Sequence, residues 1–362
     1  MMNMTAMKPL LLNNTLNEMQ ELATAMGQPT YRARQLMEWL YQKRASRFDE
    51  LTNAPKVWRT QLEEAYLLNP FRSFSAQAAA DGTRKYLFEL HDDGRYIESV
   101  SIPMKEHLTL CISTQVGCQL GCAFCLTGKQ GFFRNLETGE ILGQILAAQR
   151  DAPPGSRISN LVLMGMGEPL LNYANVTKAI RLMLAEEGLN FSNRKITLST
   201  AGIVPNMREL GQEDFTINLA VSLNAPTNDL RSELMPINRT YPIEELLAAC
   251  RAYPLPERRR ITFEYILIKQ VNDAPAQAKE LANILQGIRC KINLIPLNPN
   301  PQSAYQPPSE ATLFAFQEIL AQRGYSAFIR ASKGADISAA CGQLSGERHG
   351  FCPAENRDRN IP

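Results

Sequence analysis

The sequence predicts an α/β protein in which a small helical domain precedes a parallel sheet. Three observations predict this class. Residues 15–70 show the apolar spacing of helices, two runs between 84 and 102 alternate like β-strands, and from residue 108 onward apolar strands alternate with amphipathic helices. Such alternation favours a parallel sheet, with its chemistry at the carboxyl ends of the strands.

The composition is that of a globular protein without bulk charge. Of 362 residues, 44% are hydrophobic and 20% are charged, and 38 Lys and Arg against 36 Asp and Glu leave a net charge of +2. This excludes a disordered tail protein and one that coats nucleic acid by bulk attraction, so any RNA contact must come from local patches. No apolar run reaches the roughly 20 residues that cross a bilayer, so we expect a cytoplasmic protein without a membrane partner.

The N-terminal helical segment is assigned to a first domain at residues 1–75. Its apolar residues fall at helical spacing, as at Leu16, Met19 and Leu22. Its polar side interleaves basic and aromatic residues, namely Tyr31, Arg32, Arg34, Trp39, Tyr41, Lys43, Arg44 and Arg47. This pattern is compatible with phosphate contacts and base stacking, and equally with a solvated helix face over an aromatic core.

The remaining elements follow from the same patterns. Runs at 85–90 and 96–102 predict a hairpin within a linker at 76–107. Predicted strands follow at 108–113, 161–164, 195–198, 216–222, 261–267, 292–295 and 327–329, and predicted helices near 137–150, 175–187, 243–252, 276–286 and 309–322. Because six or seven strands are too few for an eight-fold barrel, residues 108–345 form a partly open barrel or a doubly wound sheet, with a tail at 346–362.

Three of the eight cysteines lie within eight consecutive positions. Cys118, Cys122 and Cys125 have the spacing C-x3-C-x2-C directly after a predicted strand. Structural zinc takes four ligands, and none of the three histidines follows with zinc-finger spacing. A loop with three thiolates suits a 4Fe-4S cluster that leaves one iron open for a substrate or cofactor. Zinc and a redox dithiol are the weaker alternatives.

A second motif follows the next predicted strand. The run from Gly165 through Gly167 and Glu168 to Pro169 is a glycine-rich turn. Glycine lets the backbone approach a ligand closely, and the Glu168 carboxylate can accept hydrogen bonds from a cationic amine. Many turns between a strand and a helix contain glycine, so this motif has weight only beside the cysteine loop.

With Phe124 before its last cysteine, the loop resembles the C-x3-C-x-aromatic-C signature of radical S-adenosylmethionine (SAM) enzymes. The resemblance implies a partial (β/α)6-type radical SAM barrel with an N-terminal helical accessory domain and a β-hairpin linker. It also implies that SAM chelates the open iron and is cleaved to a 5'-deoxyadenosyl radical, with Phe124 beside the nucleoside. The glycine-rich turn is similar to the motif that binds the SAM amine.

Further motifs narrow the resemblance to the RlmN/Cfr family of RNA adenine methyltransferases. They lie at 115–125, 128–135, 165–172, 198–202, 222–226 and 339–344, and the helical module resembles that family's accessory domain. The resemblance implies methylation at C2 of an adenosine in 23S ribosomal RNA and in tRNA. It further implies a 4Fe-4S cluster, two SAM molecules per turnover, an electron donor such as flavodoxin, and a monomer.

The resemblance also gives roles to three further residues. Cys341 first takes a methyl group from one SAM, and the radical from a second SAM activates this methyl for addition to the adenine, which gives a covalent protein–RNA bridge. Cys111 matches the thiol that attacks Cys341 and releases the methylated base as a disulfide forms. Glu98 matches the base that removes the ring proton. Without the resemblance, a strand cysteine is usually a small buried residue and a hairpin glutamate is solvated.

The resemblance places SAM contacts at seven residues, which are Gly167, Glu168, Ser199, Ser222, Leu223, Asn224 and Asn298. One departure is visible, because many family members have histidine where this chain has Asn224. The asparagine keeps a hydrogen-bonding side chain but removes an ionisable one. Three other cysteines, Cys250, Cys290 and Cys352, are interpreted as structural. The charge run 258–260 is compatible with RNA contact or with a solvated strand entry.

Two other functions remain open. A Cfr-type enzyme that methylates C8 of adenine uses the same residues, so the motifs do not separate the two positions, and C2 is favoured by overall similarity and because housekeeping members are commoner. A non-catalytic zinc module that binds RNA through its helical domain belongs to a different class. That module would be colourless, whereas an iron–sulfur enzyme is brown when purified without oxygen.

Overall fold

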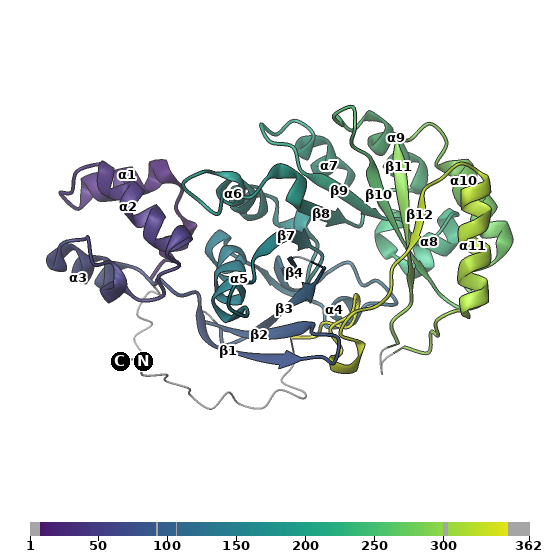
Figure 1. The fold of residues 1–362 in the computed structure, drawn as a ribbon. Helices are drawn as coiled ribbons and strands as arrows, with labels where there is room; N and C mark the ends of the chain where they lie inside the picture. Colours follow the sequence, from purple (N-terminus) through teal and green to yellow (C-terminus); the bar gives the residue numbers. More distant parts are fainter. Residues whose placement is uncertain (1–7, 92, 106, 300–302, 347–362) are drawn as a thin grey trace, which may run out of the picture.

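The computed structural model describes residues 8–91, 93–105, 107–299 and 303–346, and it has the predicted α/β architecture. Three N-terminal helices lie at one end of a ten-stranded sheet in the order β1-β2-β3-β4-β7-β8-β9-β10-β11-β12 (Figure 1). Most of the predicted tail, including Cys352, lies outside the described residues. No helix in the described part of the chain is long and apolar enough to cross a membrane.

The N-terminal module consists of α1 (Leu16–Ala25), α2 (Tyr31–Met37) and α3 (Lys56–Ala65), with short helical turns η1 (Leu11–Asn13), η2 (Glu38–Gln42) and η3 (Phe48–Glu50). Thr15 starts α1 with a reciprocal cap, because its backbone N–H donates to Glu18 and its side chain accepts from the Glu18 N–H. Polar contacts attach the module to the sheet domain. Asn13 donates to Glu137 at 2.8 Å, and Lys178 pairs with Glu18 at 2.7 Å.

The interleaved basic and aromatic residues of this module are only partly on its surface. Tyr41 is 3% exposed and belongs to the core, so its expected place on the polar side is wrong. Lys43 lies 4.0 Å above the Trp39 ring, and Arg47 pairs with Asp49. Tyr31 is 54% exposed. Periodicity misplaced Tyr41 because η2 winds as a π-helix, which rotates the following residues relative to α2.

Three antiparallel strands connect the module to the parallel part of the sheet. They are β1 (Phe71–Ala78), β2 (Arg84–Leu90) and β3 (Tyr96–Pro103). The predicted hairpin is confirmed as β2 and β3, which pair in antiparallel register. Strand β1 was not predicted and begins at Phe71, inside the segment assigned to the helical domain. Most of its residues are partly exposed, as is usual for an edge strand, so its apolar alternation is weak.

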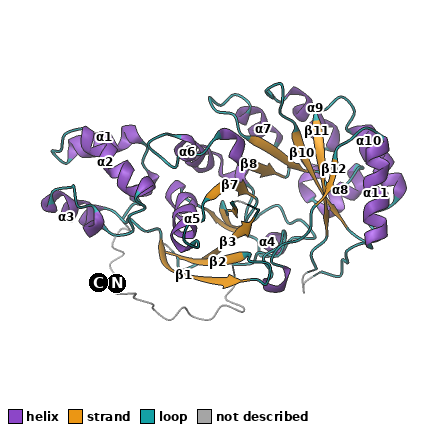
Figure 2. Cartoon of the chain, viewed as in Figure 1, coloured by secondary structure: helices purple, strands orange, loops and turns teal. Residues whose placement is uncertain are grey.

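The parallel part contains seven strands, β4 (Leu108–Cys111), β7 (Ile158–Leu163), β8 (Ile196–Thr200), β9 (Asn218–Ser222), β10 (Ile261–Leu267), β11 (Cys290–Pro296) and β12 (Ala327–Ile329). Helices connect them on the outside of the curved sheet (Figure 2). They are α5 (Thr138–Asp151), α6 (Tyr173–Leu184), α7 (Val204–Leu210), α8 (Asn228–Leu234), α9 (Ile243–Ala252), α10 (Pro275–Ile284) and α11 (Glu310–Gln322), with turns η4 (Pro169–Asn172), η5 (Asn193–Lys195), η6 (Pro236–Arg239) and η7 (Ala335–Ile337).

The strand order decides between the two predicted architectures. Consecutive parallel strands are neighbours from β4 to β12, without the reversal of order that defines a doubly wound sheet. The sheet is therefore a partly open barrel. Between β4 and α5 the chain inserts a two-stranded unit, β5 (Gln115–Gly117) and β6 (Phe132–Asn135), with the short helix α4 (Leu126–Lys129) between its strands.

Gln144 of α5 fixes the start of this insertion inside the protein. It is fully buried, and its side-chain oxygen accepts from the Ser99 hydroxyl at 2.6 Å and from the Ser113 N–H at 2.8 Å. Its side-chain N–H₂ donates to the Ser113 carbonyl at 3.0 Å. The Ser113 hydroxyl in turn accepts from the Met166 N–H at 2.8 Å. One glutamine thus joins the helix, the antiparallel extension and two strand ends.

Replacement of Gln144 by leucine should lower the free energy of unfolding by about 3 kcal/mol, because the Ser99 hydroxyl and the Ser113 backbone would be buried without partners. Denaturant unfolding followed by circular dichroism measures this loss. Gln61→Leu, at an exposed position of α3, is the matched control and should change stability little. Equal stability of the two variants would contradict the role given to Gln144.

Candidate functional site

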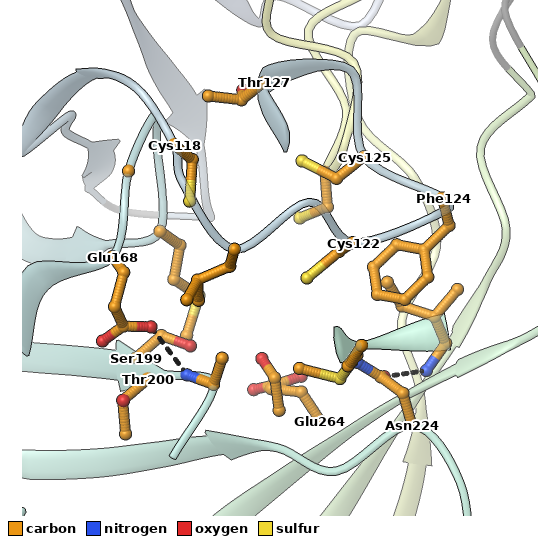
Figure 3. A pocket seen from close by; sticks show the side chains of 18 of the residues that line it. Cys118, Cys122, Phe124, Cys125, Thr127, Glu168, Ser199, Thr200, Asn224 and Glu264 are labelled. Atoms are coloured by element: carbon orange, nitrogen blue, oxygen red, sulfur yellow. Dashed lines mark hydrogen bonds between the residues drawn. The ribbon is translucent and has the colours of Figure 1, made fainter. Parts of the chain in front are cut away.

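A pocket of about 170 Å³ lies at the carboxyl ends of the parallel strands. Its walls come from the loop at 118–127 and from the ends of β7, β8, β9, β10 and β11. Figure 3 shows the cysteine loop on one side and Glu168, Ser199, Thr200, Glu264 and Asn224 on the other. The position agrees with the general rule for parallel sheets, whose loops at this edge build binding sites.

The three clustered cysteines all line this pocket (Figure 3). Burial raises the pKa of the Cys118 thiol to about 12. Burial also raises the pKa of the Cys122 thiol, and the neighbouring Cys125 and Cys118 raise it further. Three thiols gathered out of water do not become thiolates without a positive partner, because burial and mutual repulsion oppose the charge. The donor set therefore suits a bound metal centre.

The three thiols lie on one short loop with the spacing C-x3-C-x2-C. A structural zinc ion takes four protein ligands. In a 4Fe-4S cluster each thiolate binds a different iron. Three cysteines leave one iron without a protein ligand.

Close backbone packing holds the cysteine loop in place. Gly117, which precedes Cys118, has φ +75°, and a Cβ there would lie 1.9 Å from the Gly131 carbonyl oxygen of the paired strand. On the other side of the loop, the Ala123 N–H donates to the Leu234 carbonyl of α8 at 3.0 Å. The loop is thus fixed both to its own hairpin and to the helix after β9.

Glu168 occupies the turn after β7 and is 3% exposed. One carboxylate oxygen accepts from the Ala201 N–H at 2.7 Å, and the other accepts from the Leu170 N–H at 3.1 Å. Burial raises the pKa of this carboxyl to about 7. The preceding Gly167 has φ +99°, and a Cβ there would lie 2.5 Å from the Gln115 side chain. A buried carboxylate without an ion pair among the described residues suits an amine ligand.

The other residues expected to contact SAM take two kinds of position. Ser199, Ser222 and Asn224 line the pocket. Leu223 is buried behind it, with its N–H on the Glu264 carbonyl. Asn298 lies on the loop after β11, where its N–H₂ donates to the Cys341 carbonyl at 3.1 Å. The contacts of all these residues with SAM remain predictions.

Asn224 has a structural task that accounts for its residue type. Its φ of +59° lies in the left-handed region, which asparagine tolerates better than most residues. Its side-chain oxygen accepts from the Ile266 N–H at 2.8 Å, and its N–H₂ lies 3.1 Å from the Met235 sulfur. The side chain therefore ties the end of β9 to β10 while it lines the pocket.

Cys341 is exposed and lies on a mostly buried segment that reaches the same pocket. The Gly342 carbonyl accepts from the Leu126 N–H at 2.9 Å, and the Leu344 carbonyl accepts from the Thr127 hydroxyl at 2.7 Å. The segment is thus docked on α4, directly after the clustered cysteines. Surrounding protein raises the pKa of the Cys341 thiol to about 11.

Cys111 ends β4 and is buried. Burial raises the pKa of its thiol above the ordinary range, and the nearby Cys341 raises it further. A hydrogen bond from the Met164 backbone acts in the opposite direction. The Cys341 thiol is therefore within electrostatic range of Cys111, although the two residues lie more than two hundred positions apart in the sequence.

Glu98 lies on β3 and is 1% exposed, so the expectation of a solvated hairpin glutamate does not hold. It pairs with Lys85 of β2 at 3.1 Å. Its second oxygen accepts from the N–H groups of Ser345 and Gly346 at 2.6 and 3.0 Å. Glu98 is not among the residues that line the pocket. In this conformation it binds the end of the Cys341 segment.

The sequence analysis missed Glu264, which lines the pocket from β10. Its side chain is 8% exposed and accepts from the Asn293 N–H₂ at 2.9 Å. Burial raises the pKa of this carboxyl. A signal was present, because Glu264 is the one charged residue in the apolar run 261–267. An acidic side chain inside a buried strand indicates a special role.

Other residues singled out in the sequence lie away from the pocket. Arg259 and Arg260 precede the amino end of β10, where Arg259 bonds Asn193 and Arg260 bonds Ser326. This edge is opposite the carboxyl ends that form the pocket, so the charge run has a structural explanation. Cys250 on α9 and Cys290 at the start of β11 are both buried, in agreement with a structural role.

Two family models match the chain. Residues 112–282 match the radical SAM superfamily, and residues 10–68 match the ribosomal RNA large subunit methyltransferase N-terminal domain. A relative from Syntrophus aciditrophicus, named dual-specificity RNA methyltransferase RlmN, is 54% identical over 92% of this chain and 95% of its own length. A relative of the same name from Desulfosudis oleivorans is 51% identical over 96% of this chain and 93% of its own length.

A solved structure agrees with these relatives. The crystal structure of a radical SAM methyltransferase from Sphaerobacter thermophilus is 47% identical and superposes with a TM-score of 0.91, covering 94% of this chain and all of that one. The open barrel is therefore a radical SAM fold, whose enzymes use SAM and a 4Fe-4S cluster. With its pocket, its three cysteines and these relatives, the chain belongs to the RlmN family of radical SAM RNA methyltransferases.

Proposed function

We propose that the enzyme methylates C2 of an adenosine in 23S ribosomal RNA and in tRNA. The observation that carries this proposal is the gathering of Cys118, Cys122, Cys125, Glu168 and Cys341 around one pocket. Relatives over nearly the whole chain are named dual-specificity RNA methyltransferases, which supports two RNA substrates. We place the enzyme in the cytoplasm as a monomer, served by an electron donor such as flavodoxin.

The chemistry of adenine explains why a simple methyl transfer does not suffice. The C2 carbon lies between two ring nitrogens and is electron-poor, so it does not attack the methyl group of SAM as a nucleophile. When bound, the cluster and SAM supply a methyl donor and a one-electron cleavage that removes a hydrogen atom from an unactivated carbon. In this proposal Cys118, Cys122 and Cys125 hold the cluster, and Glu168 accepts hydrogen bonds from the SAM amine.

Cys341 carries the methyl group in the proposed reaction. Its sulfur takes the methyl from a first SAM and loses the thiol proton, and a second SAM is consumed to remove one hydrogen atom from that methyl. The carbon then bonds to C2 of the adenine, which joins the protein to the RNA. The docking of the Cys341 segment on α4 supports this role, because it holds the sulfur at the pocket beside the cluster ligands.

Cys111 and Glu98 complete the proposed reaction. Once the radical adduct has returned the electron that was used to cleave SAM, Glu98 takes the C2 proton. The Cys111 thiol loses its proton and its sulfur attacks Cys341, so that a disulfide forms and the bond from the Cys341 sulfur to carbon breaks. The electron pair of that bond stays on the carbon, which takes up a proton and becomes the methyl group. The influence of the Cys341 thiol on the pKa of the Cys111 thiol supports this pairing. Because the Glu98 carboxylate is held by the N–H groups of Ser345 and Gly346, its action as a base requires the end of the Cys341 segment to move away.

The N-terminal module is proposed to bind the RNA. Exposed Tyr31 offers an aromatic face, and Arg34 is an exposed cation on the same helix. Some other basic side chains of the module already have intramolecular partners, such as Arg47 with Asp49 and Lys43 with Glu38. The contribution of this module should therefore be a small number of contacts at one face, in agreement with the near-neutral composition.

The position of the methyl group tests the function directly. After anaerobic reconstitution with iron and sulfide, the protein with SAM and a reductant should methylate unmodified 23S RNA fragments and tRNA, and mass spectrometry should place the label at C2. Cys118→Ala should give no methylation and bind less iron, because one thiolate of the cluster is lost. A methyl label at C8 would show that the enzyme modifies C8 instead of C2. A colourless wild-type protein that binds only zinc would contradict the proposed iron–sulfur enzyme.

Variants that lack Cys341 or Cys111 should stop at different steps of the proposed reaction. Cys341→Ala lacks the methyl acceptor, so no protein–RNA adduct should form. Cys111→Ala should still form the carbon bridge but cannot resolve it, so protein joined to RNA should accumulate as a nuclease-sensitive slow band in denaturing gels. Cys250→Ala, a buried thiol on α9, is the control and should turn over normally. Normal turnover by Cys111→Ala would show that the assigned roles are wrong.

SAM binding should depend on pH through Glu168. Its pKa of about 7 means that the carboxyl is ionised above pH 7 and protonated below it, so it accepts fewer hydrogen bonds from the SAM amine as the pH falls. The affinity should be highest above pH 7 and approach about a tenfold fall per unit below it. Equilibrium dialysis with labelled SAM measures this. Glu168→Gln should bind weakly with a flat profile, and an unchanged slope in that variant would exclude Glu168 as the titrating group.

A further inference from the structure

Arg231 of α8 is a fully buried cation behind the pocket, with neutral hydrogen-bond partners. Its Nη2 donates to the carbonyls of Ala201 and Ser222 at 2.7 and 3.3 Å, and its Nε donates to the Leu223 carbonyl at 3.2 Å. Its Nη1 donates to the Asn238 side-chain oxygen at 3.0 Å. Three of these four partners are backbone groups where β8 and β9 end at the site.

The charge of Arg231 lacks an acidic partner within the described residues, where no carboxylate forms an ion pair with it. A buried guanidinium without a counter-charge is costly even when its N–H groups are satisfied. Burial accordingly lowers the pKa of Arg231 to about 10, while Cys122 and Cys250 act in the opposite direction. Of these two thiols, Cys122 belongs to the clustered cysteines.

The helix that carries Arg231 also touches the cysteine loop. The carbonyl of Leu234, one turn further along α8, accepts from the Ala123 N–H directly after Cys122. Ala201, whose carbonyl binds Arg231, donates its own N–H to Glu168. The Arg231 side chain therefore connects the turn after β8, which holds Glu168, with the turn after β9, and the helix that carries Arg231 contacts the cysteine loop.

We propose that Arg231 is the counter-charge of the iron–sulfur cluster and a positioning residue for the strand ends around SAM. This inference rests on the cofactor assigned above. A 4Fe-4S cluster held by three thiolates is a net anion and becomes more negative when it gains an electron. A fixed cation near Cys122 stabilises the reduced form more than the oxidised form, because the attraction grows with the negative charge. Arg231 thus raises the reduction potential of the cluster.

The test measures the cluster rather than turnover. Wild type, Arg231→Gln, Arg231→Lys and the exposed control Arg239→Gln are reconstituted without oxygen, and the reduced cluster is quantified by electron paramagnetic resonance at a fixed potential. In Arg231→Gln the ratio of reduced to oxidised cluster should fall about tenfold, as expected for the loss of one charge at an effective dielectric constant near 20. Arg231→Lys and the control should stay close to wild type.

SAM affinity separates the two parts of the role proposed for Arg231, which are charge compensation and positioning of the strand ends. Arg231→Lys keeps the charge but loses the planar fork, so it should bind SAM more weakly than wild type with little change in potential. If the ratio of reduced to oxidised cluster in Arg231→Gln equals that of wild type, Arg231 is not the counter-charge of the cluster. If this ratio falls as far in Arg231→Lys as in Arg231→Gln, Arg231 has only a structural role.

A second variant covers the case in which Arg231→Gln does not fold or take up iron. Asn238→Asp keeps the side-chain oxygen that accepts from Nη1 but gives Arg231 a local counter-charge, so it should also lower the reduced fraction. If Asn238→Asp had the same ratio of reduced to oxidised cluster as wild type, the proposal for Arg231 would be wrong. If the wild-type protein formed no cluster, the cofactor assignment itself would be wrong. If it formed a cluster whose reduction potential did not change in the Arg231 variants, only the role proposed for Arg231 would be wrong.

Discussion

Compensation of buried charge at the carboxyl edge of the parallel sheet is the constraint on which the site depends. Three thiols, the carboxyl of Glu168 and the guanidinium of Arg231 are all withdrawn from water around one pocket. Backbone groups satisfy their hydrogen bonds, but the groups still lack the opposite charges that a low-dielectric environment requires. In the proposed function, a cluster held by the thiolates and a ligand with an amine supply these charges, which explains why such a costly set of side chains is kept.

The antiparallel extension gives this edge a second function. Strands β2 and β3 bring Lys85 and Glu98 to the end of the Cys341 segment, whose N–H groups occupy the carboxylate. At the start of the same segment, Asp81 from the turn between β1 and β2 accepts from the Gly334 N–H. The extension therefore does more than link two domains. Through these hydrogen bonds it holds both ends of the segment that places Cys341 at the pocket.

Much of the fold was predictable because it follows from local periodicity. The bounds 261–267 and 243–252 coincide with β10 and α9, since each has a strong apolar pattern with clear ends. Strand β1 and helices α7 and α8 escaped prediction. The two helices have only seven residues each, and β1 is a half-exposed edge strand, so their patterns are too short or too weak. Strand order was also needed, because periodicity does not state which strands are neighbours.

The sequence by itself determined the chemistry of the cysteine loop and the family, because ligand type and spacing lie within one short segment at 118–125. The tertiary structure decided everything that depends on distant residues meeting. It brought the Cys341 thiol within electrostatic range of Cys111, buried Glu98 against the end of the Cys341 segment, placed Glu264 in the pocket lining and placed Arg231 at the strand ends behind it. Glu264 and Arg231 belong to none of the sequence motifs, because their positions at the site come from burial and from strand ends that converge only when the sheet curves into an open barrel.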